Sequence, residues 1–290
     1  MKPFLKWVGG KRWLTQKYPD LFALKFKRYV EPFLGSGAVF FHVAPARSFL
    51  SDINSELVNV YSCIRADHQR VYAKLRSHAR HHSDRYYYEV RSKKFRSPFS
   101  RAAQMLYLNR TCWNGLYREN LKGEFNVPRG TKDSVLLADD DFASVAKLLS
   151  TATITSCDFE DVITQTRRGD FVFIDPPYTV RHNSNGFIKY NESIFSWSDQ
   201  ERLASVLKRK AGSGAAYLLT NAYHPSVIDL YSKFARIIPA ERASVLSADR
   251  QHRGRTKEAI ILIGDNSWAL DDLEGSLEHR YETARRDVRI

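Results

Sequence analysis

A short run near the middle of the chain, DFVFIDPPY at 170–178, combines groups that can act together on one substrate. Apolar residues lead to Asp175, two prolines fix the backbone that follows, and Tyr178 adds an aromatic ring. A strand of this kind delivers its last residue to the carboxyl edge of a parallel sheet, where α/β folds bind ligands. We therefore expect Asp175 at a binding position; a packed Asp-Pro turn is the alternative.

These residue types suit an amino group attached to an aromatic ring such as adenine. That amine is a poor nucleophile because its lone pair is delocalised into the ring. The Asp175 carboxylate and the Pro176 carbonyl can each accept one N–H, which pulls the nitrogen toward a pyramidal geometry, while Tyr178 stacks on the heterocycle. With S-adenosylmethionine as methyl donor, the expected reaction is a direct in-line displacement. It needs positioning and charge stabilisation, but no metal and no covalent enzyme intermediate.

A second pattern, EPFLGSGAV at 31–39, is typical of a strand that runs into a glycine turn and then a helix. Gly35 and Gly37 would let the backbone approach a ligand and open the helix N-terminus toward it. A turn used only for packing is the alternative. Asp52 ends the next apolar run, where its carboxylate can accept hydrogen bonds from ribose hydroxyls. The alternative role for Asp52 is to cap the helix that follows.

The N-terminal stretch PFLKWVGGKRWL contains Gly9-Gly10-Lys11, which is similar to the end of a phosphate-binding loop. A true loop of that type reads G-x-x-x-x-G-K-[ST] and follows a strand. Here Arg12 occupies the Ser/Thr position, and the first convincing strand begins only at residue 29. The pattern therefore argues against an NTPase. We expect this turn to lay Trp7 and Lys11 against the cofactor, with Lys11 near its carboxylate; core packing is the alternative for Trp7.

The elements that must position these residues alternate between strands and helices. Strands are expected at 29–35, 48–53, 152–159, 170–178, 215–222 and 258–264. Helices are expected at 36–44 and 198–212, the second with a capping box from Ser198 to Glu201 and an apolar face on Leu203, Val206 and Leu207. This alternation predicts an α/β fold with a Rossmann-like, doubly wound and mostly parallel sheet.

Residues 55–146 differ from the rest of the chain. They show helical patterns, many aromatic residues and dense basic charge, and the segment LYRENLKGEFNVPRG at 116–130 has the pattern of a β-hairpin. We therefore expect a core at 1–54 and 147–270, a mainly helical insertion at 55–146 and a peripheral tail at 271–290.

The charge indicates the kind of partner. The 290 residues carry a net charge of +13, and residues 65–101 alone hold eleven Lys or Arg against three acids. A second basic cluster lies at 249–257. Charge concentrated in this way favours a nucleic-acid partner, with a solvated basic surface as the alternative.

Composition also excludes several classes. No apolar run approaches the roughly 20 residues that span a bilayer, and no secretory signal is visible. Cys63, Cys112 and Cys157 lack zinc or disulfide spacing, which suits a reducing cytoplasm. His78 and His82 are four residues apart, but we expect a solvated face there and no metal site.

Five blocks together resemble the DNA adenine methylase family, in which an F-x-G-x-G motif precedes D-P-P-Y. They are FLKWVGGK, VEPFLGSGAVFF, LSDINSELVNVY, LYLNRTCWNGLYREN with LKGEFNVPRG, and FIDPPY, in the family's order over about 1–265. The resemblance implies an S-adenosylmethionine-dependent methyltransferase core with an inserted target-recognition domain. The cofactor contacts that it implies are Trp7, Lys11, Gly35, Gly37, Asp52 and Asp175, with Asp158 and Phe159 beside the cofactor's adenine.

The resemblance further implies that the inserted hairpin reads GATC in double-stranded DNA. The matching recognition positions are Lys6, Leu116, Arg118 and Pro128, and Arg118 could bond a guanine edge. Trp113 occupies the position of a DNA-inserting aromatic residue, with Asn114 beside it. An aromatic wedge there would fill the stack when the target adenine is flipped out.

Two departures from the family pattern leave alternatives open. The usual Asn-His-Asp run after the fifth core strand is replaced by TNAYHPS at 220–226, and Trp113 is larger than the Tyr more usual there. The alternatives are an adenine methylase that acts on another sequence or on single strands, and a non-catalytic DNA-binding protein. The intact Asp175, Gly35, Gly37 and Asp52 argue against loss of activity. We expect a monomer.

Overall fold

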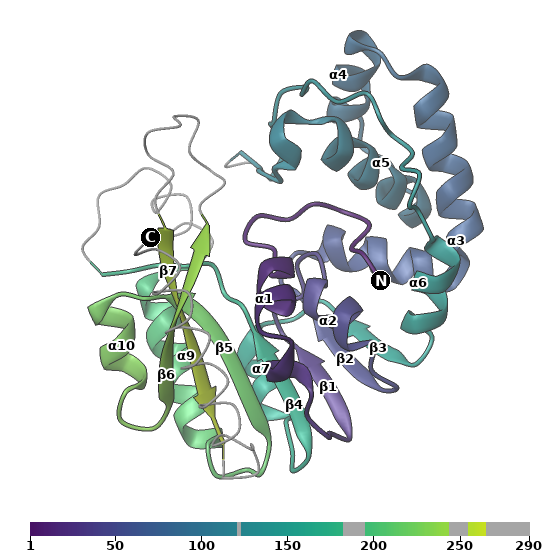
Figure 1. The fold of residues 1–290 in the computed structure, drawn as a ribbon. Helices are drawn as coiled ribbons and strands as arrows, with labels where there is room; N and C mark the ends of the chain where they lie inside the picture. The colour runs from purple at the N-terminus through teal and green to yellow at the C-terminus, as the bar shows by residue number, and fades with distance from the viewer. Residues whose placement is uncertain (121–122, 182–194, 244–254, 265–290) are drawn as a thin grey trace, which may run out of the picture. The chain divides into compact units, whose positions relative to one another are not determined.

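A computed structural model of the chain describes residues 1–120, 123–181, 195–243 and 255–264 (Figure 1). Seven strands in these ranges form one sheet in the order β3-β2-β1-β4-β5-β7-β6. They are β1 Arg28–Glu31, β2 Ser48–Ser51, β3 Ala152–Thr155, β4 Asp170–Ile174, β5 Ala216–Ala222, β6 Arg236–Ala243 and β7 Arg255–Ile263. The pairs β2–β3, β1–β4 and β4–β5 are parallel, and β7 runs antiparallel to β5 and β6. The predicted α/β fold with a mostly parallel sheet is confirmed.

Strand β4 shows why this sequence forms a central strand. Its residues Phe171, Val172, Phe173 and Ile174 are at most 1% exposed, as expected where helices cover both faces of a parallel sheet. At its start, the buried Asp170 accepts a hydrogen bond from Arg28 Nη2 at 2.6 Å, and these two residues face each other in the parallel register of β1 and β4. The same ion pair therefore fixes the register of the strand that leads into the D-P-P-Y motif.

The strand predictions differ from the structure at their ends and at one element. The strands expected at 29–35 and 170–178 stop at Glu31 and Ile174, because Pro32 and Pro176 cannot donate to a ladder. Strand β6 was not predicted, since Pro239 and charged neighbours interrupt its apolar pattern. β6 lies at the edge of the sheet, where a proline is tolerated.

The chain divides into two compact units. Unit 1 comprises Met1–Lys11 and Phe33–Asp158. Besides β2 and β3 it contains the helices α2 Ala38–Val43, α3 Ser55–His81, α4 Asp84–Ser92, α5 Pro98–Thr111 and α6 Phe142–Leu149, and the short 3-10 helix η2 Trp113–Gly115. Unit 2 comprises Arg12–Pro32 and the described residues from Phe159 onward. Besides β1 and β4 to β7 it contains α1 Arg12–Lys17, the 3-10 helix η1 Pro19–Phe22, α7 Phe159–Thr164, α9 Trp197–Lys210 and α10 Pro225–Tyr231.

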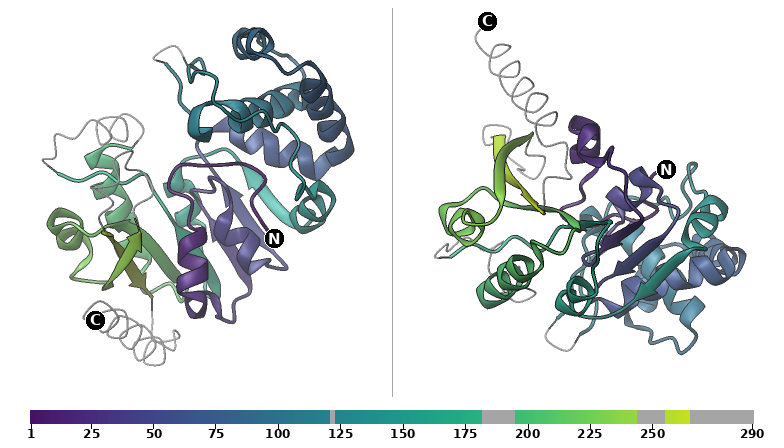
Figure 2. Two further views of the ribbon diagram at one scale, coloured as in Figure 1. Left: turned by 45° about the horizontal axis from the view of Figure 1, so that its top comes forward. Right: turned by 90° about the horizontal axis from the view of Figure 1, so that it is seen from below.

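The helices of unit 1 form a group in which α3 and α5 pack against each other, as the blue and teal segments in Figure 2 show. Helix α3 begins where the side chain of Asn54 accepts a hydrogen bond from the Leu57 N–H at 2.9 Å. It bends at Asp67, whose backbone is not helical and whose carboxylate accepts from the Arg70 N–H at 2.9 Å, as a second cap would. Arg110 of α5 is buried and donates to both oxygens of Asp140 at 2.7 and 2.6 Å.

Helix α9 is present where a helix was expected, but the predicted capping box is wrong. The N-cap is Ser196, whose hydroxyl accepts from the Asp199 N–H, while the Asp199 carboxylate accepts from the Ser196 N–H. The predicted partner Glu201 instead accepts a hydrogen bond from Trp197 Nε1 at 2.9 Å. The apolar face is confirmed, since Leu203, Val206 and Leu207 are buried.

The expected C-terminal tail at 271–290 lies outside the described residues, as does most of the basic cluster at 249–257. Within the described part of the chain, no helix is both long and apolar enough to cross a membrane.

Candidate active site

The glycine turn of unit 1 connects Leu34 to helix α2. Gly35 and Gly37 both have left-handed φ angles, +48° and +64°, which favour glycine over any other residue. At Gly35 there is a second reason. A Cβ there would lie 2.8 Å from Cδ1 of Trp7, so the indole can approach the turn only because the side chain is missing. The turn is therefore shaped by contact with the N-terminal segment.

Asp52 follows β2 and bonds directly to this turn. Its Oδ2 accepts a hydrogen bond from the Gly35 N–H at 3.0 Å, and its Oδ1 accepts from the Asn54 N–H at 3.0 Å. The alternative of Asp52 as the helix cap is wrong, because Asn54 caps α3. Burial raises the pKa of Asp52, and the N–H groups of Gly35, Asn54 and Ile53 oppose that rise. The result is a carboxylate held rigidly beside the glycine turn.

The Gly9-Gly10-Lys11 turn brings two more predicted residues together in unit 1. Lys11 is only 3% exposed, and its ammonium group donates to the Gly9 carbonyl at 2.7 Å. The Trp7 indole stacks on Tyr117, with ring centroids 5.3 Å apart and planes inclined by 27°. Trp7 therefore contacts both Gly35 and the ring of Tyr117.

Asp158 and Phe159 follow β3, and the division of the chain falls between them. Asp158 is half-buried at the end of unit 1. Phe159 begins α7 in unit 2, where its ring lies 5.6 Å from that of Phe195 and the Arg202 guanidinium sits 4.2 Å above it. Phe159 is thus part of the packing of α7 and α9.

In unit 2, the D-P-P-Y motif leaves the carboxyl end of β4, and residues distant in the chain bond to three of its four members. Thr220 of β5 donates from its hydroxyl to Asp175 Oδ1 at 2.8 Å. Gln200 of α9 donates to the Pro177 carbonyl at 3.3 Å. The Tyr178 hydroxyl donates to Oε2 of Glu258, on β7, at 2.7 Å. The motif is therefore held by β5, α9 and β7.

The fourth member of the motif is Pro176. Among the residues that the structure describes, no donor bonds to its carbonyl oxygen. Tyr178 is kept neutral, since burial raises its pKa well above the ordinary value and the charges of Asp175 and Glu258 raise it further. The motif thus presents the Asp175 carboxylate, the Pro176 carbonyl and the ring of a neutral Tyr178.

The run TNAYHPS at 220–226, which begins within β5, supplies part of this support. Thr220 and Asn221 are fully buried, and Asn221 donates from Nδ2 to Gln200 Oε1 at 3.0 Å, which orients Gln200 toward Pro177. Sequence reasoning left the contacts of this run in doubt. It also missed Glu258 and Gln200, for which a buried polar residue at a strand end or on a helix face was the available signal.

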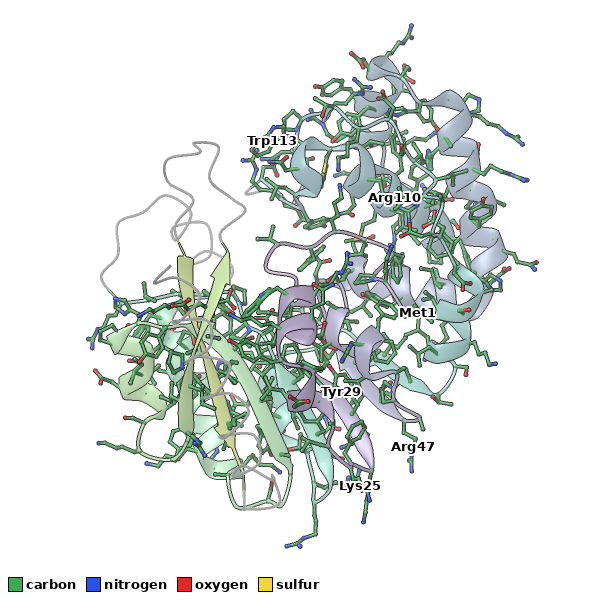
Figure 3. All side chains as sticks on the ribbon, viewed as in Figure 1. Met1, Lys25, Tyr29, Arg47, Arg110 and Trp113 are labelled. Atoms are coloured by element: carbon green, nitrogen blue, oxygen red, sulfur yellow. The ribbon has the colours of Figure 1, made fainter. Side chains whose placement is uncertain are left out.

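The predicted DNA-contacting residues gather in unit 1 around η2. Trp113 is 52% exposed. Figure 3 shows it at the border of the helical region formed by α3, α4 and α5, whereas Arg110 lies within that region. Asn114 has a left-handed φ of 54°, and the Trp113 N–H donates to the Pro128 carbonyl at 2.9 Å. The tight turn presents the indole outward while Pro128 fixes its backbone.

Asn109 of α5 clamps this turn to the N-terminal segment. The buried Asn109 accepts from the Lys6 N–H at 2.8 Å and donates to the carbonyls of Lys6 at 2.8 Å and Gly115 at 3.2 Å. Lys6 is exposed overall, but partial burial of its ammonium group lowers its pKa, and the neighbouring Lys132 lowers it further. Lys6 and the turn carrying Trp113 are therefore fixed relative to each other, which the sequence did not reveal.

The hairpin expected at 116–130 is present in part. Glu119 and Phe125 form an isolated antiparallel bridge, as do Cys112 and Arg129. The Asn126 N–H donates to the Arg118 carbonyl at 3.1 Å. The exposed Arg118 side chain donates from Nε to Asn126 Oδ1 at 2.8 Å, and the half-buried Leu116 precedes it. The loop thus orients the guanidinium of Arg118.

The solvated face expected for the two histidines is wrong, because His78 is buried. Its Nδ1 shares a hydrogen bond with the Tyr86 hydroxyl at 2.9 Å, and its ring stacks on Tyr107 with centroids 5.0 Å apart. His82 shares a bond of 2.8 Å with the Tyr107 hydroxyl. These residues form part of the core of the helical region. Within the described residues, no three His, Cys, Asp or Glu side chains are grouped so that they could hold a metal ion.

Comparison with known proteins identifies the family. The profile of the D12 class of N6 adenine-specific DNA methyltransferases matches residues 7–245. The type II methyltransferase M1.LlaDCHI of Lactococcus lactis subsp. cremoris is 34% identical over 270 residues, covering 90% of this chain and 95% of that protein. The DNA adenine methylase of Haemophilus influenzae is 31% identical over 271 residues, covering 91% and 94%.

A third relative, the type II methyltransferase M.MjaIII of Methanocaldococcus jannaschii, is 34% identical over 255 residues, covering 80% of this chain and 87% of that protein. The resemblance found from the five sequence blocks is thereby confirmed. The glycine turn with Asp52 and the D-P-P-Y motif at the end of β4 are parts of an adenine methyltransferase, and the chain belongs to the D12 class of N6 adenine-specific DNA methyltransferases.

Proposed function

We propose that this protein methylates N6 of a flipped-out adenine within GATC in double-stranded DNA. The observation that carries the proposal is the D-P-P-Y motif, whose Asp175 and Tyr178 are each bonded by a buried residue, Thr220 and Glu258. Family membership gives the reaction class and the DNA substrate; the target sequence and the residue roles belong to the proposal.

In this mechanism, Asp175 and the Pro176 carbonyl each accept one N–H of the adenine amine. A carboxylate has four lone-pair positions, of which the bond from Thr220 at 2.8 Å takes one. Because Thr220 and Gln200 fix the loop, its acceptors need no rearrangement when the amine enters, which is the condition for electrostatic preorganisation. The Tyr178 ring stacks on the base, and the negative Asp175 stabilises the positive charge that develops on the nitrogen.

The family implies S-adenosylmethionine, which supplies the methyl group when bound. The residues of the glycine turn fit this cofactor. Asp52 can accept from ribose hydroxyls, Lys11 carries a positive charge for the amino-acid carboxylate, and the missing Cβ at Gly35 allows a close approach. We assign Trp7, Gly37, Asp158 and Phe159 to the same cofactor.

We assign DNA recognition to the proposed insertion at 55–146, with a single copy of the chain acting on cytoplasmic DNA. Trp113 is exposed and backed by a tight turn, as a wedge that replaces a flipped base would be. Arg118 and Lys6 are proposed to bond base edges, with Leu116 and Pro128 shaping the contact and Asn114 beside the wedge. The basic charge at 65–101 would hold the phosphates.

A second candidate is an adenine methylase for a sequence other than GATC. It is favoured by one observation, that the relatives include type II methyltransferases as well as DNA adenine methylases. Transfer of tritiated methyl groups to a GATC duplex and to a scrambled duplex separates the two candidates. Transfer to the scrambled duplex at the same rate would overturn the GATC assignment.

The catalytic assignment is tested with Asp175→Ala, which we expect to abolish methyl transfer to the GATC duplex. Asp229→Ala, at an exposed aspartate on α10, serves as the matched control and keeps the wild-type rate. Normal turnover by Asp175→Ala would refute the catalytic role of the motif.

Recognition is tested with Arg118→Ala. We expect it to lose about 1–3 kcal/mol of discrimination at one base pair, while the other positions of the site keep theirs. The measurement is the methylation rate on duplexes with single base-pair changes in GATC. An unchanged preference at every position would show that Arg118 does not read the sequence.

A further inference from the structure

A buried carboxylate lies next to the proposed catalytic tyrosine and has no role in the mechanism so far. Glu258 is 3% exposed and sits on β7, paired with Ala222 of β5 on one side and Ala240 of β6 on the other. Burying a carboxylate between strands is costly unless hydrogen bonds satisfy it. The Tyr178 hydroxyl supplies such a bond at 2.7 Å, across 80 residues of sequence.

This bond determines how the Tyr178 ring can move. A phenol has two rotatable side-chain torsions, and the ring alone could rotate in the space beside the loop. The hydroxyl oxygen lies on the axis about which the ring rotates, so its bond to Glu258 of β7 fixes the direction of that axis. Because a phenol O–H prefers to lie in the plane of its ring, the position of the acceptor also favours one orientation of the ring plane. The hydroxyl can serve as a permanent donor because Tyr178 stays protonated in its buried, negatively charged surroundings.

The arrangement parallels the one at the other end of the motif. Thr220 of β5 bonds to Asp175, and Glu258 of the neighbouring strand β7 bonds to Tyr178. Two adjacent strands therefore hold the acceptor and the stacking ring of one loop. A residue whose purpose was only to stabilise the sheet would not need to be charged at this position, since an apolar residue of similar volume usually serves as well.

We propose that Glu258 is a positioning residue for adenine methylation, which holds the Tyr178 ring in the position where the target base stacks on it. The proposal rests on the proposed function, in which Tyr178 contacts the base. Glu258 itself contacts neither the base nor the methyl donor. Its loss should lower the rate of methyl transfer and leave the affinities for DNA and for S-adenosylmethionine unchanged.

The experiment compares Glu258→Leu, Glu258→Gln, Tyr178→Phe and the double variant Glu258→Leu with Tyr178→Phe. Single-turnover methylation of a GATC duplex gives the rate, and equilibrium titrations give the two affinities. We expect Glu258→Leu and Tyr178→Phe each to lose about tenfold in rate, since each removes the same hydrogen bond to a charged group. The double variant should lose no more than either single variant, because both act through one contact.

Glu258→Gln is the conservative variant, whose amide oxygen can still accept from the hydroxyl, and it should retain most of the rate. Glu241→Leu, on the neighbouring strand β6, is the matched control and should behave as the wild type. If Glu258→Leu does not fold, Tyr178→Phe and Glu258→Gln still decide the matter, because Tyr178→Phe removes a single oxygen atom.

A wild-type rate in Tyr178→Phe or in Glu258→Leu would overturn the proposal, as would additive losses in the double variant. A loss of DNA or cofactor affinity at an unchanged rate would also overturn it. Failure of the proposed function looks different. In that case Asp175→Ala would still methylate the duplex, whatever the Glu258 variants do.

Discussion

The glycine turn of unit 1 and the D-P-P-Y loop of unit 2 are built in different ways. The glycine turn is held mainly by segments close in sequence, such as Asp52, which bonds to Gly35 across 17 residues. Its contacts involve main-chain groups and a missing side chain. The D-P-P-Y loop is held by side chains 45 and 80 residues away, on Thr220 and Glu258. We propose that the turn binds the cofactor through its shape, whereas the loop acts through fixed charges and hydrogen bonds.

The strongest test of this division is Asp175→Asn, which keeps the size of the side chain but removes its charge. We expect the rate of methyl transfer to fall about a thousandfold, because the developing positive charge loses its stabilising anion. The dissociation constant for S-adenosylmethionine should rise far less than the rate falls, because Asp175 is only one of the cofactor contacts that the family resemblance implies. Single-turnover rates and calorimetric titrations measure the two quantities. A large loss of cofactor affinity would show that the two regions do not divide binding from chemistry.

Low pH should destabilise unit 1 in particular, because the buried His78 lies in unit 1. Burial lowers the pKa of His78 to about 4, and the positive charges of His81, Lys74 and Lys93 contribute. Below pH 6.5 the His78 imidazole is therefore protonated in the unfolded chain, whereas in the folded chain it becomes protonated only near pH 4. The contribution of His78 to the free energy of unfolding is therefore fully present above pH 6.5. It is lost progressively toward pH 4, by about 3 kcal/mol in total.

Denaturation by urea between pH 7 and pH 4 measures this loss, and hydrogen exchange locates it. The exchange should accelerate in the helices of unit 1 that surround His78. His78→Phe should flatten the pH dependence, whereas the exposed His42→Gln should leave it as in the wild type. A pH profile that His78→Phe does not change would mean that other groups cause the loss.

Gly35→Ala is the counterpart of the Asp175 test on the glycine turn. The new Cβ would lie 2.8 Å from Trp7 Cδ1, at a residue with a φ of +48°. A clash and a strained backbone cost about 1–3 kcal/mol. We expect cofactor affinity to fall about ten- to a hundredfold, while the rate at saturating cofactor changes little.

Gly123→Ala is the matched control, because Gly123 has a φ of +72° but no neighbouring atom within 4 Å of the added Cβ. It shares the backbone strain without the contact to Trp7, so its cofactor affinity should equal that of the wild type. An equal loss of affinity in both variants would trace the effect of Gly35→Ala to general destabilisation.

The same contrast explains what could be predicted from the sequence. The reactive groups were identifiable because each lies in a short run, such as Asp175 after apolar residues and Gly35 after a strand. Most of the strands were predicted for the same reason. The partners that fix these groups were not predictable, since nothing near Glu258 or Thr220 in the sequence indicates that they meet Tyr178 and Asp175. That information resides in the register of β5 and β7, which only the folded sheet determines.

Sequence patterns also led to wrong predictions where two patterns competed for the same residues. Ser198 and Glu201 have capping-box spacing, but so do Ser196 and Asp199, and the bond from Trp197 to Glu201 accompanies the second choice. His78 lies in a run of basic residues that suggests an exposed face. The helix period nevertheless turns it inward, where Tyr86 and Tyr107 satisfy it.

The smallest expected effect concerns Tyr117, which lies within the proposed insertion and stacks on Trp7. Its hydroxyl donates to Glu119. An aromatic pair contributes about 0.5–1.5 kcal/mol. Tyr117→Leu should therefore weaken S-adenosylmethionine binding about two- to tenfold, and Tyr117→Phe, which keeps the stack, should weaken it less.

Because Tyr117 lies between Leu116 and Arg118, this stack joins the glycine turn to the loop proposed to read DNA. If it couples the two, a GATC duplex should change cofactor affinity in the wild type, and the change should shrink in Tyr117→Leu. Titration of the cofactor with and without duplex, in both proteins, gives the coupling as a double difference. If the coupling is equal in the two proteins, Tyr117 affects only cofactor binding. The stack would then support Trp7 but would not link cofactor affinity to DNA binding at the recognition loop.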